Sequence, residues 1–384
     1  MPAVETASAS SAPNPPSSSQ RLMSVDALRG FVMFWIIGAD ALFYALDKMF
    51  PTGPVHLMAV QLEHVNWEGL RFYDLIFPTF VFIIGVSVVF SVTKMVATEG
   101  RGAATRRIIR RGVLLYLLGI FYYGGFAGHF EKIRLVGVLQ RLAICYTCAA
   151  LLFCWLRPRT LIAICAGILL GYWALMALVP VPGVGAGNYE EGKNLANYID
   201  REYLPLRKWD GDHDPEGLLS NLPAISSCLL GVFAGMLLRN PSVDEQKRVR
   251  LLIMGAVALL IAGFVWSIWF PIIKKIWTSS YVLAAAGYSS LFLAFFYWMI
   301  DVRKKSTWAQ PFVWIGTNAI VAYMLDNLVD FGKLGARLAG GDLKDHLNAA
   351  VHPGFGDLLV AVAGLICAFL ILRFLYKQRI FLRL

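Results

Sequence analysis

The chain has 384 residues, of which 58% are hydrophobic and 16% are charged. A soluble domain carries about 45–50% apolar and about 25% charged residues, so this composition excludes a disordered protein and argues against a soluble enzyme. Its 35 Lys and Arg outnumber its 25 Asp and Glu, which gives a formal net charge of +10. Such an excess suits nucleic-acid binding or the cytoplasmic loops of a membrane protein, and the position of the charges decides between them.

Residues 1–20 consist mainly of Ser, Pro and Ala. Such a segment cannot bury enough apolar surface to offset its ordering entropy, so we predict a disordered polar tail. It has no basic region followed by an apolar one, so we do not expect a signal peptide. Residues 21–384 are predicted to form a single transmembrane domain.

Apolar stretches of about 20 residues follow the tail, and each is long enough to cross about 30 Å of hydrocarbon as a helix. The sequence therefore predicts an all-α, polytopic membrane bundle with about ten transmembrane helices. The predicted spans are 27–47, 70–93, 112–127, 138–156, 160–180, 219–238, 251–270, 280–300, 309–329 and 357–376.

An even number of spans places both termini on one side, and most basic loop residues fall on that side. The strongest cluster is Arg106, Arg107, Arg110 and Arg111. The positive-inside rule then places both termini in the cytoplasm. The basic residues are spread over several short loops, which excludes a nucleic-acid-binding surface. No Cys/His spacing resembles a zinc site, and we predict no metal.

Ionisable residues inside spans are functional-site candidates because they are costly to bury in lipid. Asp40 lies in the first predicted span and Asp74 near the outer end of the second. The short loop between them carries His64, so we expect these three side chains to meet. A His beside a carboxylate is a general-base arrangement. The alternatives are a solvated loop His64 and an Asp74 that merely favours a helix N-terminus.

Three further polar positions have competing interpretations. Arg141, at the outer end of the fourth span, either extends to water or binds an anion or a carboxylate. Asn318 lies near mid-depth in the ninth span, where Asn often joins two helices. Asp214-Pro215-Glu216 precedes a span, and this pattern is typical of a helix N-terminus with Asp214 as the N-cap. Alternatively, the carboxylates bind the hydroxyl groups of a sugar.

Several blocks, taken together and in order, resemble the heparan-alpha-glucosaminide N-acetyltransferase family, and the resemblance runs from about residue 21 to 330. The opening block is shared with wider membrane acyltransferase families, so the later blocks carry the specificity. The blocks are RLMSVDALRG at 21–30, HVNWEGL at 64–70, DLIFPTFVFIIG at 74–85, IRLVGVLQRL at 133–142, DPEG at 214–217 and GTNAI at 316–320.

The resemblance implies a transmembrane acyltransferase that moves an acetyl group from cytoplasmic acetyl-CoA to an amino sugar or similar amine on the outer side. It implies that His64 is the active histidine and Asp74 its carboxylate. Asp40 stands where the family is expected to carry Asn, so its catalytic role is open. The family's lysosomal members carry an extra luminal region, whereas only the tail precedes residue 21 here, so the acceptor need not be heparan sulfate.

Further site expectations follow from the same resemblance. The donor is expected to thread the bundle past Asn318, Gln140 and Arg141, and the acceptor to contact a set of outer-loop residues. We expect a bacterial inner membrane, and the lysosomal members suggest a homodimer. Whether the acetyl group passes directly or through acetylated His64 is open. The expected acceptor contacts are Trp67, Asn66, Asp214 and Glu216.

A proton-coupled transporter is the competing hypothesis, with Asp40, Asp74 and Asp326 as a proton relay. Transporters often have repeated halves, and no motif in residues 21–180 recurs in 219–376. The sequence therefore lacks the internal repeat that would favour a transporter.

Overall fold

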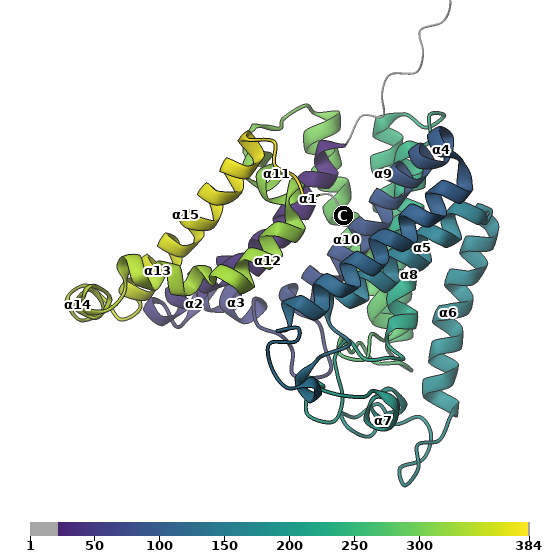
Figure 1. Cartoon of the computed structure of the whole chain (residues 1–384), viewed down its shortest axis with the longest axis horizontal. Coiled ribbons are helices and arrows are strands. Elements are labelled where there is room, and N and C mark those ends of the chain that lie inside the picture. The colour runs from purple at the N-terminus through teal and green to yellow at the C-terminus, as the bar shows by residue number, and fades with distance from the viewer. Residues whose placement is uncertain (1–21, 383–384) are drawn as a thin grey trace, which may run out of the picture.

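The computed structural model describes residues 22–382, and these fold almost entirely into helices (Figure 1). The predicted tail, 1–20, lies outside the described residues. The predicted all-α class is confirmed. The α-helices are α1 (Met23–Phe34), α2 (Asp40–Met49), α3 (Gly53–Gln61), α4 (Ile76–Tyr122), α5 (Val138–Trp155), α6 (Pro158–Leu178), α7 (Leu195–Tyr203), α8 (Asn221–Arg239), α9 (Glu245–Trp266), α10 (Ser279–Tyr297), α11 (Gln310–Thr317), α12 (Ala319–Val329), α13 (Phe331–Ala339), α14 (Asp342–Ala350) and α15 (Phe355–Lys377).

Among the described residues, eight helices are long and apolar enough to cross a membrane, or up to nine if the bent pair α11–α12 is one span. This confirms a multi-pass membrane protein. If the bent pair is counted as one span, the remaining difference from the predicted ten is the segment Phe72–Tyr122, which is continuous and contains two predicted spans, 70–93 and 112–127.

That segment crosses twice because α4 folds back on itself. A straight helix of 47 residues would be roughly 70 Å long, more than twice the hydrocarbon thickness. The backbone leaves the helical region at Gly100, with φ 81° and ψ 168°. Asp74 before α4 and Tyr122 at its end line the same cavity, which a straight helix would not allow. The second arm ends at Tyr122 rather than 127, because Gly124 and Gly125 take positive φ values there.

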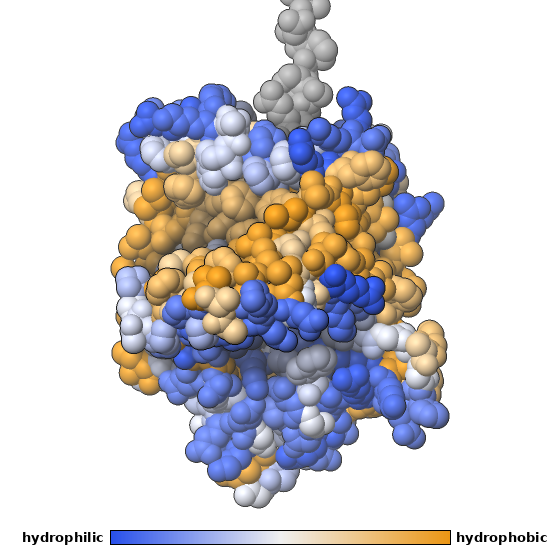
Figure 2. Space-filling model, turned by 90° about the vertical axis from the view of Figure 1, so that its left-hand side faces the viewer, coloured by the Kyte–Doolittle hydropathy of each residue, from blue (hydrophilic) through white to orange (hydrophobic). Residues whose placement is uncertain are grey.

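The helices form two groups, with α1, α2 and α11 to α15 on the left and α4 to α6 and α8 to α10 on the right (Figure 1). Helix α1 contacts both α4 and α10 and so joins the groups. Helix α7 and loop 181–218 lie at one end, which we call the α7 end; α1 begins at the opposite end, the α1 end (Figure 1). Figure 2 shows apolar side chains in a band between hydrophilic zones, as expected for a bilayer-embedded surface.

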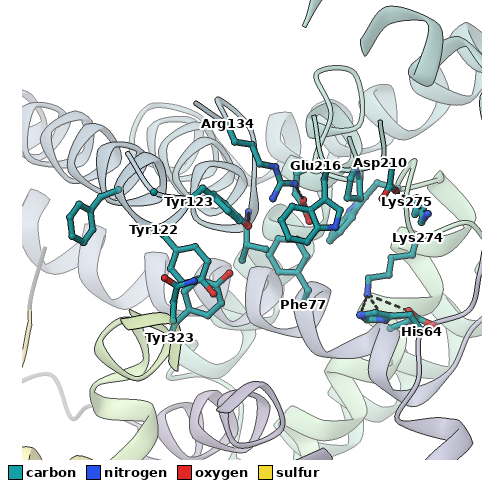
Figure 3. A pocket seen from close by; sticks show the side chains of 18 of the residues that line it. His64, Phe77, Tyr122, Tyr123, Arg134, Asp210, Glu216, Lys274, Lys275 and Tyr323 are labelled. Atoms are coloured by element: carbon teal, nitrogen blue, oxygen red, sulfur yellow. Dashed lines mark hydrogen bonds and ion pairs between the residues drawn. The ribbon is translucent and has the colours of Figure 1, made fainter. Parts of the chain in front are cut away.

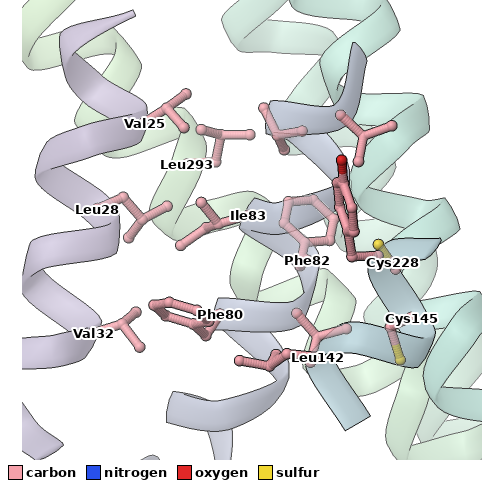
Figure 4. Packing of buried hydrophobic residues seen from close by; sticks show 14 of the residues in the cluster. Val25, Leu28, Val32, Phe80, Phe82, Ile83, Leu142, Cys145, Cys228 and Leu293 are labelled. Atoms are coloured by element: carbon pink, nitrogen blue, oxygen red, sulfur yellow. The ribbon is translucent and has the colours of Figure 1, made fainter. Parts of the chain in front are cut away.

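The two groups meet in an apolar core. Val25, Leu28 and Val32 of α1 point toward Phe80 and Ile83 of α4 (Figure 4). On its other side, α1 packs closely against α11, because glycines allow their backbones to approach. A Cβ at Gly30 would lie 1.7 Å from the Phe312 carbonyl oxygen, and one at Gly316 would lie 1.8 Å from that of Asp26. Two of the sequence blocks, 21–30 and 316–320, are thus in direct contact.

Two of the predicted spans are broken rather than continuous. The span 27–47 contains a π-helical turn, Trp35–Ala39, with Gly38 at φ 110°, directly before Asp40. The span 309–329 bends by 70° at Asn318. Non-helical backbone at membrane depth is tolerated where it is buried in protein or lines a cavity. Both breaks lie close to the cavities described next.

Candidate active site

A cavity of about 870 Å³ opens between the loops of the α7 end and the ends of α4 and α12. This volume lies within the range of about 300–1,000 Å³ typical of ligand sites. Its wall is charged on the loop side and largely aromatic and aliphatic on the helix side (Figure 3). The lining residues that matter below are His64, Trp67, Asp74, Phe77, Phe121, Tyr122, Arg134, Trp209, Glu216, Lys274, Trp277, Tyr323 and Leu328.

His64 and Asp74 form a hydrogen-bonded pair in this cavity, as the sequence predicts. Nδ1 of His64 lies 2.7 Å from Oδ1 of Asp74, whose side chain is fully buried. The other oxygen of Asp74 accepts hydrogen bonds from the backbone N–H groups of Val65 and Arg71, at 3.3 and 3.2 Å. The carboxylate is therefore fixed in orientation. If Nδ1 donates to Asp74, Nε2 of His64 is the nitrogen that can take up a proton.

A third residue, Lys274, joins this pair from a distant part of the chain. Its Nζ lies 2.9 Å from Nδ1 of His64 and 3.2 Å from Oδ1 of Asp74 (Figure 3). Burial lowers the pKa of Lys274, and the charge of Asp74 acts in the opposite direction. Sequence reasoning missed Lys274, although the adjacent Lys274 and Lys275 before a span offered a weak signal.

Loop pairing brings Lys274 to the histidine. Glu68 and Ile273 form an isolated antiparallel bridge, and the N–H of Gly69 donates to the carbonyl of Ile272 at 2.9 Å. The turn after Lys274 is strained, because the bulky Trp277 is at φ 53°. Strained backbone of this kind is common at functional sites, and here it places the Trp277 ring in the cavity wall.

The structure does not bring Asp40 into the histidine pair. Its side chain instead pairs with Tyr73, whose hydroxyl donates to Oδ2 of Asp40 at 3.3 Å. Tyr73 in turn lies against His64, with ring centroids 4.8 Å apart. Asp40 does not line the cavity. The expected meeting of three side chains is therefore wrong for Asp40, because the π-turn at Gly38 redirects the helix before it.

A buried ion-pair cluster forms another part of the charged wall. Arg134 donates to both oxygens of Asp214 at 2.6 and 2.9 Å and to Glu216 at 2.7 Å. Its guanidinium lies 4.4 Å from the Tyr123 ring centroid and 4.9 Å from that of Trp209. Burial alone would lower the pKa of Arg134, but the hydrogen bonds to Asp214 and the charge of Glu216 raise it. Burial raises the pKa of Glu216.

Asp214 and Glu216 consequently have different positions. Glu216 lines the cavity, whereas Asp214 is buried behind it and accepts from the backbone N–H of Trp209. The predicted N-cap role of Asp214 is wrong, because α8 begins only at Asn221. Asp214 instead closes a turn by accepting from the N–H of Glu216.

Of the two predicted acceptor contacts in the first loop, only one faces the cavity. Trp67 lines it, and its ring N–H donates to the carbonyl of Tyr189 at 2.9 Å, which ties the first loop to the large loop. Asn66 is exposed and does not line the cavity. The chain bends at Asn66 and Trp67, and only the second of these side chains lines the cavity.

A second cavity of about 270 Å³ lies toward the α1 end. Asn318, at the bend between α11 and α12, lines it, and so do Arg29 and Arg111. Arg111 lies 4.8 Å from the Tyr146 ring centroid, and no carboxylate is paired with it among residues 22–382. The Asn318 amide donates to the carbonyl of Ile380, and its oxygen Oδ1 has no hydrogen-bond partner within the described chain.

Gln140 and Arg141, the other predicted donor contacts, line neither cavity. Gln140 is buried against Gly119. Arg141 is buried beneath Trp277, 4.6 Å from its ring centroid, and donates to the hydroxyl of Ser220. The outward extension of Arg141 is therefore also wrong, because it points into the protein rather than along its own helix to water.

A small third cavity, which we call the neck, lies between the other two. Its volume is about 20 Å³. It shares Phe77, Val138 and Tyr323 with the large cavity, and Phe80, Leu142, Ala319 and Ile320 with the second one. The neck is thus a neighbour of both cavities.

One cluster of possible metal ligands lies beside the large cavity, formed by Glu191, Asp210 and His213. The ammonium of Lys275 lies 2.8 Å from Glu191 and 2.9 Å from Asp210 and compensates their charges. This cation accounts for the acidic groups, and we assign no metal to them.

Comparisons with known proteins identify the family of the chain. The family model described as "Heparan-alpha-glucosaminide N-acetyltransferase, catalytic" matches residues 21–211, which include His64 and Asp74. The chain is 28% identical over 373 residues to heparan-alpha-glucosaminide N-acetyltransferase of Homo sapiens, covering 79% of this chain and 52% of that protein. It is 27% identical over 375 residues to the Mus musculus protein of the same name, covering 80% and 53%. The chain spans about half the length of these relatives, and it belongs to the heparan-alpha-glucosaminide N-acetyltransferase family.

Proposed function

We propose that the chain is a transmembrane acetyltransferase that moves an acetyl group from acetyl-CoA at the α1 end to the amine of an amino sugar at the α7 end. The observation that carries this proposal is the His64–Asp74 pair in a cavity that adjoins the neck, which in turn adjoins a second, arginine-lined cavity. The human and mouse relatives are both named as N-acetyltransferases, which supports the acetyl-transfer reaction.

The pair suits proton transfer during acetylation. An amino sugar enters largely as an ammonium ion, and His64 removes its proton while Asp74 stabilises the imidazolium. The amine then attacks the thioester carbonyl, the C–N bond forms and the C–S bond breaks. The departing thiolate takes the proton from His64, and the nitrogen of the new amide releases its second proton to water, which leaves the N-acetyl product, CoA as the thiol and a neutral His64. If His64 is acetylated first, its Nε2 forms the bond to the acetyl carbon while the C–S bond breaks and the CoA thiolate leaves. The amine, after losing a proton to that thiolate, then forms the C–N bond while the bond to Nε2 breaks, and its second proton is released to water.

The second cavity suits the donor's phosphates. Arg111 and Arg29 are cations in its wall. Asn318 lies in the same wall, and Arg29 is also ion-paired with Asp26 at 3.0 Å. Guanidinium groups are the preferred partners of phosphates in proteins. The neck of about 20 Å³ is too narrow for a pantetheine arm, so its side chains must move to admit the thioester.

The same assignment gives an orientation. The basic cluster of Arg106, Arg107, Arg110 and Arg111 would face the cytoplasm together with the beginning of α1, which places both termini there and the large cavity on the far side. In a bacterial cell this membrane would be the inner membrane. Labelling of single cysteines introduced in loop 181–218 with an impermeant reagent tests this orientation.

The test of function is acetyl transfer by the purified protein in lipid nanodiscs with labelled acetyl-CoA and glucosamine. His64→Ala is expected to lower kcat by about 100-fold or more, the usual contribution of a general base. His56→Ala is the matched control, because His56 also pairs with a carboxylate, Asp47 at 2.9 Å, but lies outside the cavity. Undiminished transfer by His64→Ala would refute the assignment.

The same measurements separate the remaining alternatives. Label that stays on the wild-type protein when acceptor is omitted would indicate acetyl-histidine. Flux of the amine driven by a pH gradient, without any need for acetyl-CoA, would favour the transporter hypothesis instead.

A further inference from the structure

The wall of the large cavity continues directly into the lipid-facing surface. Phe121, in the last turn of α4, is 58% exposed, and Leu328, near the end of α12, is 61% exposed, yet both line the cavity. Both helices belong to membrane-spanning segments. Their exposed apolar side chains therefore face hydrocarbon rather than water, and the cavity borders the bilayer at this point.

Two stacked tyrosines stand at this border. The rings of Tyr122 and Tyr323 are 4.5 Å apart and nearly parallel, at 14°. Figure 3 shows them on the side of the cavity away from His64, with Phe77 between. Stacked aromatic rings form a flat surface on which the apolar face of a sugar ring packs. The cavity thus leads from a polar site at His64, past aromatic rings, to a lipid-exposed edge.

The loop after α4 supports the same direction of access. Gly124 and Ala127 line the cavity, while Phe126 and Phe130 of this loop are 79% and 69% exposed. Aromatic side chains at the ends of spans anchor in the interfacial region of a bilayer. This loop would therefore rest on the membrane surface while its inner side forms part of the cavity wall.

The polar wall lies on the opposite side. Arg134, Glu216 and Lys274 come from the loops of the α7 end and face the cavity (Figure 3). An acceptor that fits this division has a polar, amine-bearing head and an apolar tail. A free polysaccharide leaves the exposed apolar edge without a role.

We propose that the acceptor is a lipid-anchored amino sugar held in the leaflet at the α7 end. Its amine lies at His64, and its acyl chains leave the cavity between Phe121 and Leu328. This inference rests on the proposed acetyl transfer and adds the substrate class. The bond changes are unchanged: the amine gains the acetyl group and CoA leaves as the thiol.

The experiment compares two acceptors in nanodiscs with acetyl-CoA: glucosamine linked to a dialkylglycerol, embedded in the bilayer, and free glucosamine in solution. We expect kcat/KM to be at least tenfold higher for the lipid-linked acceptor. Phe121→Ser and Leu328→Ser should lower this preference at least fivefold. Leu117→Ser is the control, because Leu117 is 54% exposed one turn earlier on α4 but does not line the cavity.

Each other outcome counts against the proposal in a distinct way. Equal use of the two acceptors, or a preference that survives both serine variants, overturns the lipid-anchored acceptor while leaving acetyl transfer intact. If the wild type is a dimer, and Phe121→Ser is a monomer that keeps the preference for the lipid-linked acceptor, this edge binds a second copy of the chain and the proposal is wrong. Failure to acetylate either acceptor contradicts the proposed function itself.

Discussion

The ammonium of Lys274 lies 2.9 Å from Nδ1 of His64, 210 residues away in the chain. Nδ1 cannot donate to Asp74 and accept from Lys274 at once, so the ammonium must direct its hydrogen bond to Asp74 when the histidine acts as a base. In that arrangement Lys274 compensates a buried carboxylate and repels a second positive charge. Lys274 therefore positions the pair rather than reacting with the substrate.

The pH dependence of activity tests this role. Because burial lowers the pKa of Lys274 from its ordinary 10.5, the wild-type rate should fall at an alkaline pH below that value as the ammonium is lost. Lys274→Met should lower kcat about tenfold and abolish this alkaline decline. Lys275→Met should retain it, because Glu191 and Asp210 raise the pKa of Lys275 against the effect of burial. A decline that persists in Lys274→Met would exclude the lysine as its source.

The two candidate carboxylates should differ sharply in their contribution to catalysis. Asp74 contacts His64 directly, whereas Asp40 reaches it only through Tyr73. We expect Asp74→Asn to lower kcat by about 100-fold, since the amide no longer holds the required tautomer, and Asp40→Asn by less than tenfold. Steady-state kinetics of the two variants provide the comparison. A larger loss in Asp40→Asn would restore the catalytic role that the sequence left open.

The sequence predicted the local features of this site and missed the long-range ones. His64 and Asp74 are ten residues apart, so a short loop alone brings them together. Lys274 arrives through pairing of two distant loops, Glu68 with Ile273, which no local pattern reveals. Hydropathy located the spans, but it could not show that Arg141 points inward, because an amphipathic side chain near an interface can turn either way.

The sequence did not predict the breaks in the helices, for a related reason. Gly38 and Asn318 lie within runs of apolar residues, where membrane helices tolerate both residue types. Only the tertiary structure shows that the first break precedes Asp40 and that the second lies at a cavity. Hydropathy responds to composition, and the composition of a broken span is the same as that of a straight one.

Asp200 should make the stability of the α7 end depend on pH. It is buried, accepts hydrogen bonds from the N–H groups of Leu218 and Asp214 at 2.8 and 3.3 Å, and burial raises its pKa to about 6. Because its pKa is raised in the folded state, Asp200 stabilises the folded protein most at pH values below its ordinary pKa of 3.8. This contribution to the free energy of unfolding, about 3 kcal/mol, is lost as the pH rises toward 6.

Thermal unfolding in detergent measures this effect. The midpoint of the wild type, relative to that of Asp200→Asn, should fall between pH 4 and pH 6 and stay level above. The asparagine variant has a constant defect, because its amide nitrogen cannot accept a backbone hydrogen bond. Parallel curves for the two proteins would show that Asp200 does not titrate in this range.

The neck between the cavities should control acetyl transfer without controlling donor binding. Ala319, the first residue of α12, lines both the neck and the second cavity. A phenyl group at this position would fill a passage of about 20 Å³ that the thioester arm must widen. Ala319→Phe is therefore expected to lower kcat by about 100-fold, because the acetyl group can no longer reach His64. Overpacking costs about 1–3 kcal/mol, so the folded state should survive.

Binding and transfer must be measured on the same variants to make this prediction decisive. Desulfo-CoA should still stabilise Ala319→Phe against heat, since Arg111 and Asn318 are untouched. Ala319→Val, which adds less volume, should give an intermediate rate, and that graded series distinguishes a blocked passage from a misfolded protein. Full transfer by Ala319→Phe would mean that the acetyl group reaches the large cavity by another route, and the second cavity would then lose its assignment as the donor site.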